Sequence, residues 1–147
     1  MSTYQHILFA VDFFEHGDQV AEKARQIAAQ NNAKLSLVHV VDNLPITDPA
    51  YGPIIPFDVD LTQEFLEASK KHLQELGEKL QVPVERQYLE MGSPKYEIVR
   101  VAEDNQVDLI VVGSHGRHGF ALLLGSTANG VLHHAKCDVL AVRLADD

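Results

Sequence analysis

The part of the sequence with the clearest potential for chemistry is the glycine-rich segment GSHGRHGFALLLGSTANG at residues 113–130. Glycines allow a backbone to approach a phosphate group closely, and the free N–H groups at the start of a helix attract anions. Gly125 and Ser126 stand where such a helix would begin, so the segment predicts a phosphate-binding loop. The same spacing also fits glycines that only form turns, and by itself it leaves both interpretations open.

A second candidate is Asp12, which ends the first apolar run of the chain, residues 5–12. In open sheets of parallel strands, ligands bind beyond the carboxyl ends of the strands. A carboxylate at that place accepts hydrogen bonds from ribose hydroxyls or from an adenine amine. The alternative interpretation is a carboxylate that only serves a turn before the next helix.

The histidines of the chain raise the question of a metal site. His115 and His118 share the glycine-rich segment, whereas His133 and His134 are adjacent in a predicted helix. Adjacent helical residues point in different directions, so the second pair does not easily share one metal ion. No cysteine or carboxylate cluster has the spacing of a zinc site, and we therefore expect no metal ligands.

Candidate nucleophiles are equally weak in this sequence. Ser114 and Ser126 lack a GxSxG context, and no base is placed beside them by the sequence, so we assign no catalytic residue. Cys137 is the single cysteine and has no CxxC partner, which favours a plain packed thiol. One cysteine forms no internal disulfide, so the sequence implies no oxidising compartment.

Alternating apolar runs and amphipathic segments position these residues. We predict strands at 5–12, 34–41, 84–89, 108–113 and 138–143, and helices at 19–30, at 61–80, from Ser93 and Pro94 onward, and at 126–135. The run at 108–113 is apolar without alternation, which is typical of a parallel strand buried on both faces. Because strands and helices alternate, the pattern predicts one α/β domain, residues 1–147, with right-handed crossovers.

One segment, residues 42–60, interrupts this pattern. It holds four of the six prolines, which remove hydrogen-bond donors and favour an irregular loop. Asp60 and Gln63 have the spacing of a capping box, so we expect the following helix to begin there.

The charge distribution limits the partners of the protein. The formal net charge is −9, and neither Lys nor Arg occurs from residue 35 to residue 69. Such a surface repels a nucleic-acid backbone, so we expect no nucleic-acid partner, although a local anion site made of backbone N–H groups remains compatible. No apolar run is long enough to span a membrane, and the first residues do not resemble a signal peptide. We therefore expect a cytoplasmic protein without a membrane partner.

Four segments together resemble the universal stress protein family. They are HILFAVDF, LSLVHVVD, GSPKYEIVRVAEDNQVDLIVVGSHGRHG and LLLGSTANGVLHHAKCDVLAVR, and they cover nearly the whole chain in this order. The resemblance implies an adenine nucleotide alpha hydrolase-like fold: a five-stranded parallel sheet in the order 3-2-1-4-5, with helices on both faces. It also implies a homodimer in which the last strand, residues 138–143, pairs across the subunit boundary.

The resemblance further implies a site for ATP, with Mg²⁺. ATP-binding members of the family carry the motif Gly-x2-Gly-x9-Gly-Ser/Thr, and Gly113, Gly116, Gly125 and Ser126 match its four fixed positions. Asp12 matches an aspartate that contacts the nucleoside, and two valines match positions that flank the adenine. Apart from these matches, we expect a histidine or an arginine of the loop to lie near the phosphates. The candidate binding residues are Asp12, Val40, Val112, Gly113, His115, Gly116, Arg117, Gly125, Ser126 and Thr127.

The sequence departs from the motif at one point. Eight residues, rather than nine, separate Gly116 from Gly125, which shortens the loop or shifts the register of its glycines. Members that do not bind nucleotide, typified by universal stress protein A, tend to lose the glycines themselves. The sequence therefore lies between the two groups.

Three functions follow from these observations. The first is a non-enzymatic stress-response protein that binds ATP and signals through a dimer, with slow hydrolysis at most. The second is a dimeric stress protein without nucleotide, which acts through protein contacts and which the short spacing favours. The third is a nucleotide-dependent hydrolase or transferase, which the acidic composition and the lack of a P-loop lysine disfavour.

Overall fold

Strands and helices alternate along the chain in the computed structural model, which describes residues 4–11, 17–42, 58–114 and 125–143. The elements are β1 (His6–Ala10), α1 (Gly17–Asn31), β2 (Lys34–Asp42), α2 (Asp58–Leu80), the 3₁₀ helix η2 (Val84–Arg86), β3 (Gln87–Gly92), α3 (Pro94–Asp104), β4 (Leu109–Gly113), α4 (Ser126–His134) and β5 (Asp138–Val142). The five strands pair in parallel in the order β3-β2-β1-β4-β5, which confirms the predicted topology.

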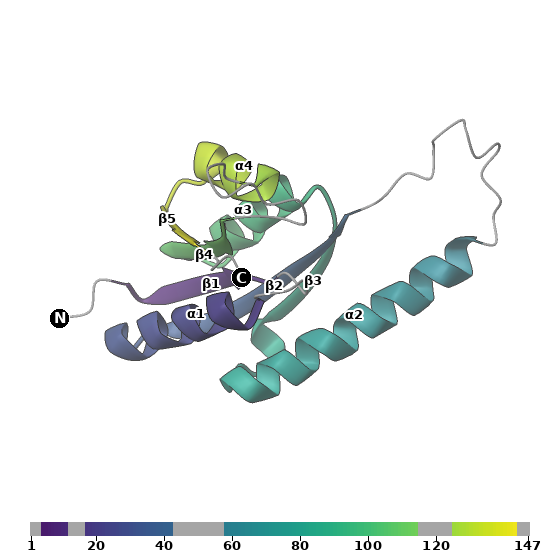
Figure 1. Ribbon diagram of the computed structural model, residues 1–147, viewed down its shortest axis with the longest axis horizontal. Coiled ribbons are helices and arrows are strands. Elements are labelled where there is room, and N and C mark those ends of the chain that lie inside the picture. The colour runs from purple at the N-terminus through teal and green to yellow at the C-terminus, as the bar shows by residue number, and fades with distance from the viewer. Residues whose placement is uncertain (1–3, 12–16, 43–57, 115–124, 144–147) are drawn as a thin grey trace.

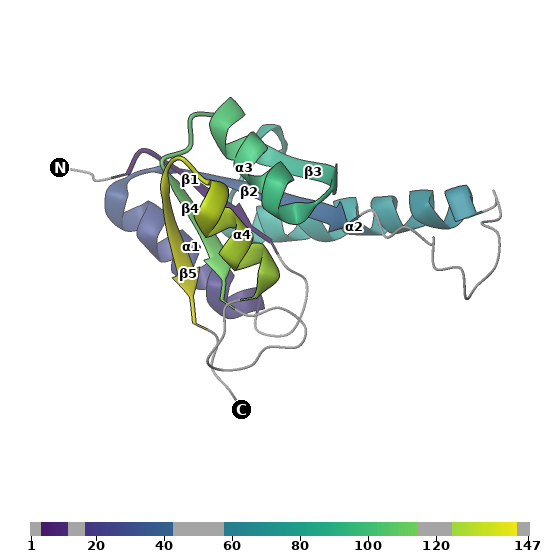
Figure 2. The same cartoon turned by 90° about the horizontal axis from the view of Figure 1, so that it is seen from above.

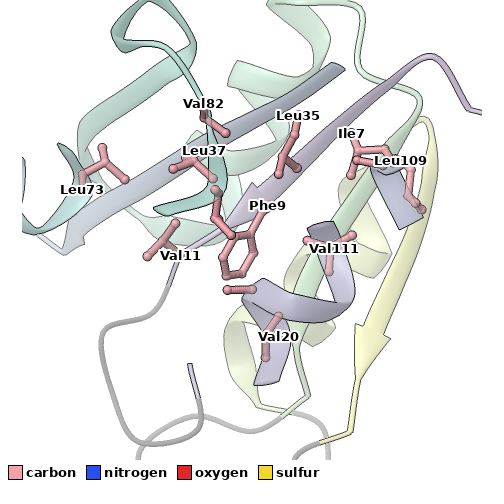
Figure 3. Packing of buried hydrophobic residues seen from close by; sticks show 14 residues of the cluster. Ile7, Phe9, Val11, Val20, Leu35, Leu37, Leu73, Val82, Leu109 and Val111 are labelled. Carbon is pink, nitrogen blue, oxygen red and sulfur yellow. The ribbon is translucent and has the colours of Figure 1, made fainter. Parts of the chain in front are cut away.

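Helices cover both faces of this sheet (Figure 1). α1 and α2 pack on one face, and α3 and α4 pack on the other. Each face has its own apolar core. In the core beneath α1, the Phe9 ring points from β1 toward the helix and is 1% exposed (Figure 3). Truncation of such a side chain to alanine typically costs about 3–5 kcal/mol.

The central strands explain why the sheet is parallel and buried. Side chains of a strand alternate between its two faces, so Ile7 and Phe9 enter one core whereas Leu8 enters the other. The same holds for Ile110 and Val111 of β4. Because both faces are covered, the sequence of these strands is apolar without alternation, as we predicted for β4.

The third strand begins later than the sequence indicated. We predicted a strand at 84–89, but residues 84–86 form η2 and β3 starts at Gln87. Pro83 is extended, with φ −68° and ψ 160°, and its carbonyl accepts a hydrogen bond from the Arg86 N–H at 2.9 Å. This turn contains residues 84–86, which the weak alternation of apolar and polar residues had placed in the strand. The Arg86 side chain then donates to the Leu35 carbonyl at 3.0 Å and fixes the turn against β2.

The second helix begins earlier than predicted. α2 starts at Asp58, so Asp60 belongs to its first turn and the predicted capping box is wrong. The final part of the helix packs on the sheet, where Leu73 is 2% exposed. Its first part extends beyond the sheet, and Phe65 there is exposed (Figures 1 and 2). The remainder of the predicted 42–60 loop, residues 43–57, lies outside the described residues.

Candidate functional site

The start of α4 lies beside the end of β4. Gly113 is the last residue of β4 and pairs with Val142 of β5. The Ser114 N–H donates to the Val142 carbonyl at 2.9 Å, which continues the ladder by one residue. The Gly125 N–H then donates to the Ser114 carbonyl at 2.6 Å. These contacts bring together Gly113 and Gly125, the two outer glycines of the predicted phosphate motif, at the carboxyl edge of the sheet.

The start of α4 has the properties of an anion-binding terminus. Gly125 is its N-cap residue, with φ −64° and ψ 159°, and it has no side chain that could cap the first turn. The first hydrogen bond of the helix runs from the Asn129 N–H to the Gly125 carbonyl at 2.9 Å. A helix offers no internal partner to the N–H groups that precede this bond, and its dipole adds positive potential there. Ser126 is exposed and Thr127 half-buried in this turn.

The two valines predicted to flank an adenine lie on one face of the sheet. Val40 in β2 and Val112 in β4 both belong to the core beneath α3 and α4. β1 separates their strands, and the half-buried Ala10 packs against the same core. Both valines are buried, so their side chains lie in the core beneath the surface at the carboxyl ends of the strands.

Four of the predicted binding residues lie outside the described residues: Asp12, His115, Gly116 and Arg117. The structure does place the backbone that leads to the first of them. The Val11 N–H donates to the Val38 carbonyl at 2.7 Å, and the Val11 carbonyl is 2.9 Å from Nδ1 of His39. A carbonyl oxygen only accepts, so Nδ1 of His39 carries the proton of this hydrogen bond. Both polar backbone groups of Val11 are therefore bound to β2.

Sequence reasoning missed His39. Its signal was a single polar ring in the apolar run LSLVHVV, immediately before Val40. It also missed a role for Ser114, which it considered only as a nucleophile. Ser114 is buried, and its hydroxyl is the only buried side-chain nitrogen or oxygen without a hydrogen-bond partner in the described part of the chain.

The remaining chemical candidates stand apart from this site. Within the described ranges, no group of three or more His, Cys, Asp or Glu residues is placed to hold a metal ion. The exposed His134 contacts the ring of Tyr96, with the ring centres 5.1 Å apart. Cys137 is half-buried, and burial raises the pKa of its thiol. It lines a cavity of about 300 Å³ between α3 and the start of β5, at the opposite edge of the sheet from Gly113.

No helix in the described part of the chain is both long and apolar enough to cross a membrane. The four α-helices α1, α2, α3 and α4 each pack an apolar face on the sheet.

Comparisons with known proteins agree on one family. The model of the universal stress protein family matches residues 3–143. Universal stress protein A homolog 1 of Coxiella burnetii is 45% identical over 141 residues, which cover 95% of this chain and 96% of that protein. The structure of the hypothetical protein MJ0577 is similar at a TM-score of 0.81 and 26% identity, covering 98% and 99% of the two chains. A universal stress protein in complex with cAMP is similar at a TM-score of 0.66 and 26% identity, covering 98% and 100%. The chain belongs to the universal stress protein family.

Proposed function

We propose that this protein is a non-enzymatic stress-response protein that binds ATP, with Mg²⁺, at the carboxyl edge of the sheet between β4 and α4. The observation that carries the proposal is the 2.6 Å hydrogen bond from the Gly125 N–H to the Ser114 carbonyl. It holds the start of α4 beside Gly113, so that free N–H groups and a flexible glycine backbone meet at one point. The similar universal stress protein in complex with cAMP supports an adenine nucleotide as the class of ligand.

The nucleoside end of the proposed site is built from the neighbouring strands. Asp12 would contact the nucleoside, and Val40 and Val112 would lie beside the adenine. The hydrogen bonds of Val11 to β2 support this part of the proposal, because they fix the backbone that leads directly to Asp12. His115, Gly116 and Arg117 would complete the phosphate end together with Gly125, Ser126 and Thr127. We expect slow hydrolysis at most, since the sequence places no base beside the phosphates.

The proposed assembly is a homodimer formed by residues 138–143. β5 is the edge strand of the sheet (Figure 2), and it pairs with β4, whose end belongs to the proposed nucleotide site. An edge strand has hydrogen-bonding groups on its outer side, which a second copy of the same strand can satisfy. We further propose that residues 1–147 are a single domain and that the protein works in the cytoplasm.

A second function has one observation in its favour. The eight-residue spacing between Gly116 and Gly125 is one residue shorter than the ATP-binding motif. A dimer that binds no nucleotide and acts through protein contacts would keep the same fold and the same edge strand. Binding measurements separate the two functions directly.

The substitution Gly125→Val tests the phosphate cradle. The φ and ψ angles of Gly125 are extended, which valine also adopts, so we expect the fold to be kept while the side chain fills the cradle. ATP affinity, measured by calorimetric titration, should fall at least tenfold. Ser93→Val is the matched control: it places the same side chain at the exposed N-cap of α3, next to the edge strand β3, and should leave the affinity unchanged. Equal affinity of Gly125→Val and the wild type would contradict the proposed site.

A further inference from the structure

The unpaired hydroxyl of Ser114 is the starting point. Native proteins pair nearly all of their buried polar groups, because an unpaired one loses its hydrogen bonds to water without replacement. Ser114 is 7% exposed, and its hydroxyl has no partner. Ser36, which lies near the amino ends of the strands, is a buried serine whose hydroxyl does have a partner. It is fully buried, and its hydroxyl lies 2.6 Å from Nε2 of His6.

The backbone of Ser114 places this hydroxyl on the side of α4. Its N–H continues the ladder to Val142, so the alternation of β4 carries on through residue 114. Val112 faces the core beneath α3 and α4, and Ser114, two residues later, faces the same way. Its carbonyl also binds the N–H of the N-cap residue Gly125. The hydroxyl therefore lies on the face of the sheet that the first turn of α4 covers.

We propose that Ser114 is a phosphate-binding residue whose hydroxyl donates a hydrogen bond to a phosphate oxygen of the bound nucleotide. This inference rests on the proposed nucleotide function and assigns a role to a residue at a variable position of the glycine motif, between Gly113 and Gly116. Two features of the structure converge on an anion at this point: the N–H groups of the first turn of α4, and a buried donor with no other partner. No protein hydrogen bond of the hydroxyl has to break when the phosphate binds, so the new bond offsets the cost of the unpaired buried donor.

A ligand-binding role predicts that stability and affinity respond differently to Ser114→Ala. Without ligand, the variant loses only an unpaired polar atom, so its melting temperature should equal or exceed that of the wild type. A hydrogen bond to a charged group is lost in the complex, so the affinity for ATP should fall by roughly tenfold or more. The affinity for inorganic tripolyphosphate should fall by a similar factor. The affinity for adenosine, which has no phosphate, should stay unchanged.

Ser36→Ala is the matched control. It makes the same chemical change at a second buried serine, but it removes a hydroxyl that already has a protein partner. We expect a lower melting temperature and an unchanged affinity for ATP, because Ser36 lies near the amino edge of the sheet, away from Gly113. Ser114→Ala should thus lower the affinity for ATP without lowering the melting temperature. Ser36→Ala should lower the melting temperature without changing the affinity.

The measurements are calorimetric titrations of ATP, tripolyphosphate and adenosine, together with thermal denaturation of the ligand-free proteins. If the wild type binds none of these ligands, the nucleotide function and this inference both fail. If the wild type binds ATP and Ser114→Ala binds it equally well, the nucleotide function stands and the role of Ser114 is wrong. A clear loss of ligand-free stability in Ser114→Ala, or an equal loss of affinity for adenosine, would show a structural role and would also overturn the inference.

Discussion

At the scale of single residues, two histidines stabilise opposite edges of the sheet. His39 lies near the carboxyl edge and donates from Nδ1 to the Val11 carbonyl, next to the proposed nucleoside end. His6 is buried at the amino edge, where Nδ1 donates to the Asn105 carbonyl at 3.0 Å and Nε2 meets the Ser36 hydroxyl. The first arrangement adjoins the proposed nucleotide site, and the second lies in the core at the opposite end of the strands.

Substitution of His39 should affect the nucleotide site through the backbone. In His39→Leu the Val11 carbonyl loses its partner, so the position of the following Asp12 is less fixed. We expect ATP affinity to fall several-fold and the free energy of unfolding to fall by about 1 kcal/mol. His39→Asn places an amide N–H close to the position of Nδ1 and should keep more of the affinity. Calorimetric titration of both variants checks the prediction, and equal affinity of His39→Leu and the wild type would refute it.

Protonation of His6 should make the fold sensitive to acid. Burial, and to a lesser extent Lys34 and Arg86, lowers the pKa of His6 below its usual value of 6.5, whereas the bond to Asn105 and the charge of Asp108 oppose this shift. The unfolded chain therefore binds the proton more tightly, and the contribution of His6 is fully present above pH 6.5. It is lost as the pH falls below 6.5 toward the lowered pKa of the folded state.

The pH prediction is checked by comparing the wild type with His6→Gln. The free energy of unfolding, measured by denaturant titration, should fall less between pH 7.5 and pH 5.5 in the variant, because it lacks this proton uptake. Carboxylates elsewhere affect both proteins equally. Parallel pH profiles of the two proteins would show that His6 does not contribute.

At the scale of the elements, the pattern of apolar residues predicted which segments are strands and helices better than where they begin. β1 and β4 are buried on both faces, and this burial leaves an apolar run that is easily recognised. β3 is a half-buried edge strand, so its pattern is weak and did not distinguish the turn after Pro83 from the strand itself. The start of α2 at Asp58, three residues before the predicted start at residue 61, was missed because the spacing of Asp60 and Gln63 was interpreted as a capping box.

The direction of the β5 backbone gives a specific test of the dimer edge. The Val142 carbonyl accepts from Ser114 of β4, and alternate residues of a parallel strand bond to opposite neighbours. The polar backbone groups of Leu140 therefore face β4, whereas those of Val139 face outward. Val139→Pro should remove an outward donor and give a folded monomer in sedimentation experiments. Leu140→Pro should instead break the ladder to β4 and unfold the domain. A folded Val139→Pro variant that still sediments as a dimer would exclude this interface.

At the scale of the whole molecule, the sheet order brings distant segments to one edge. β1 and β4 are neighbours at its centre, so the carboxyl ends of these two strands lie side by side although about 100 positions separate them in the chain. The resemblance to a family predicted this strand order, which the structure confirms. It did not predict the unpaired Ser114 hydroxyl or the bond from His39 to Val11, because both depend on three-dimensional contacts that no motif encodes.

The most direct test of the proposed nucleotide function is a calorimetric titration of ATP with Mg²⁺ into the nucleotide-stripped wild-type protein. We expect saturable binding of one nucleotide per chain, with a dissociation constant of about 1 µM, which corresponds to a binding free energy of about −8 kcal/mol. This result would mean that the shortened loop still accommodates the phosphates. No binding heat from a folded dimer, at several temperatures, would contradict the nucleotide function and indicate that the protein acts through protein contacts.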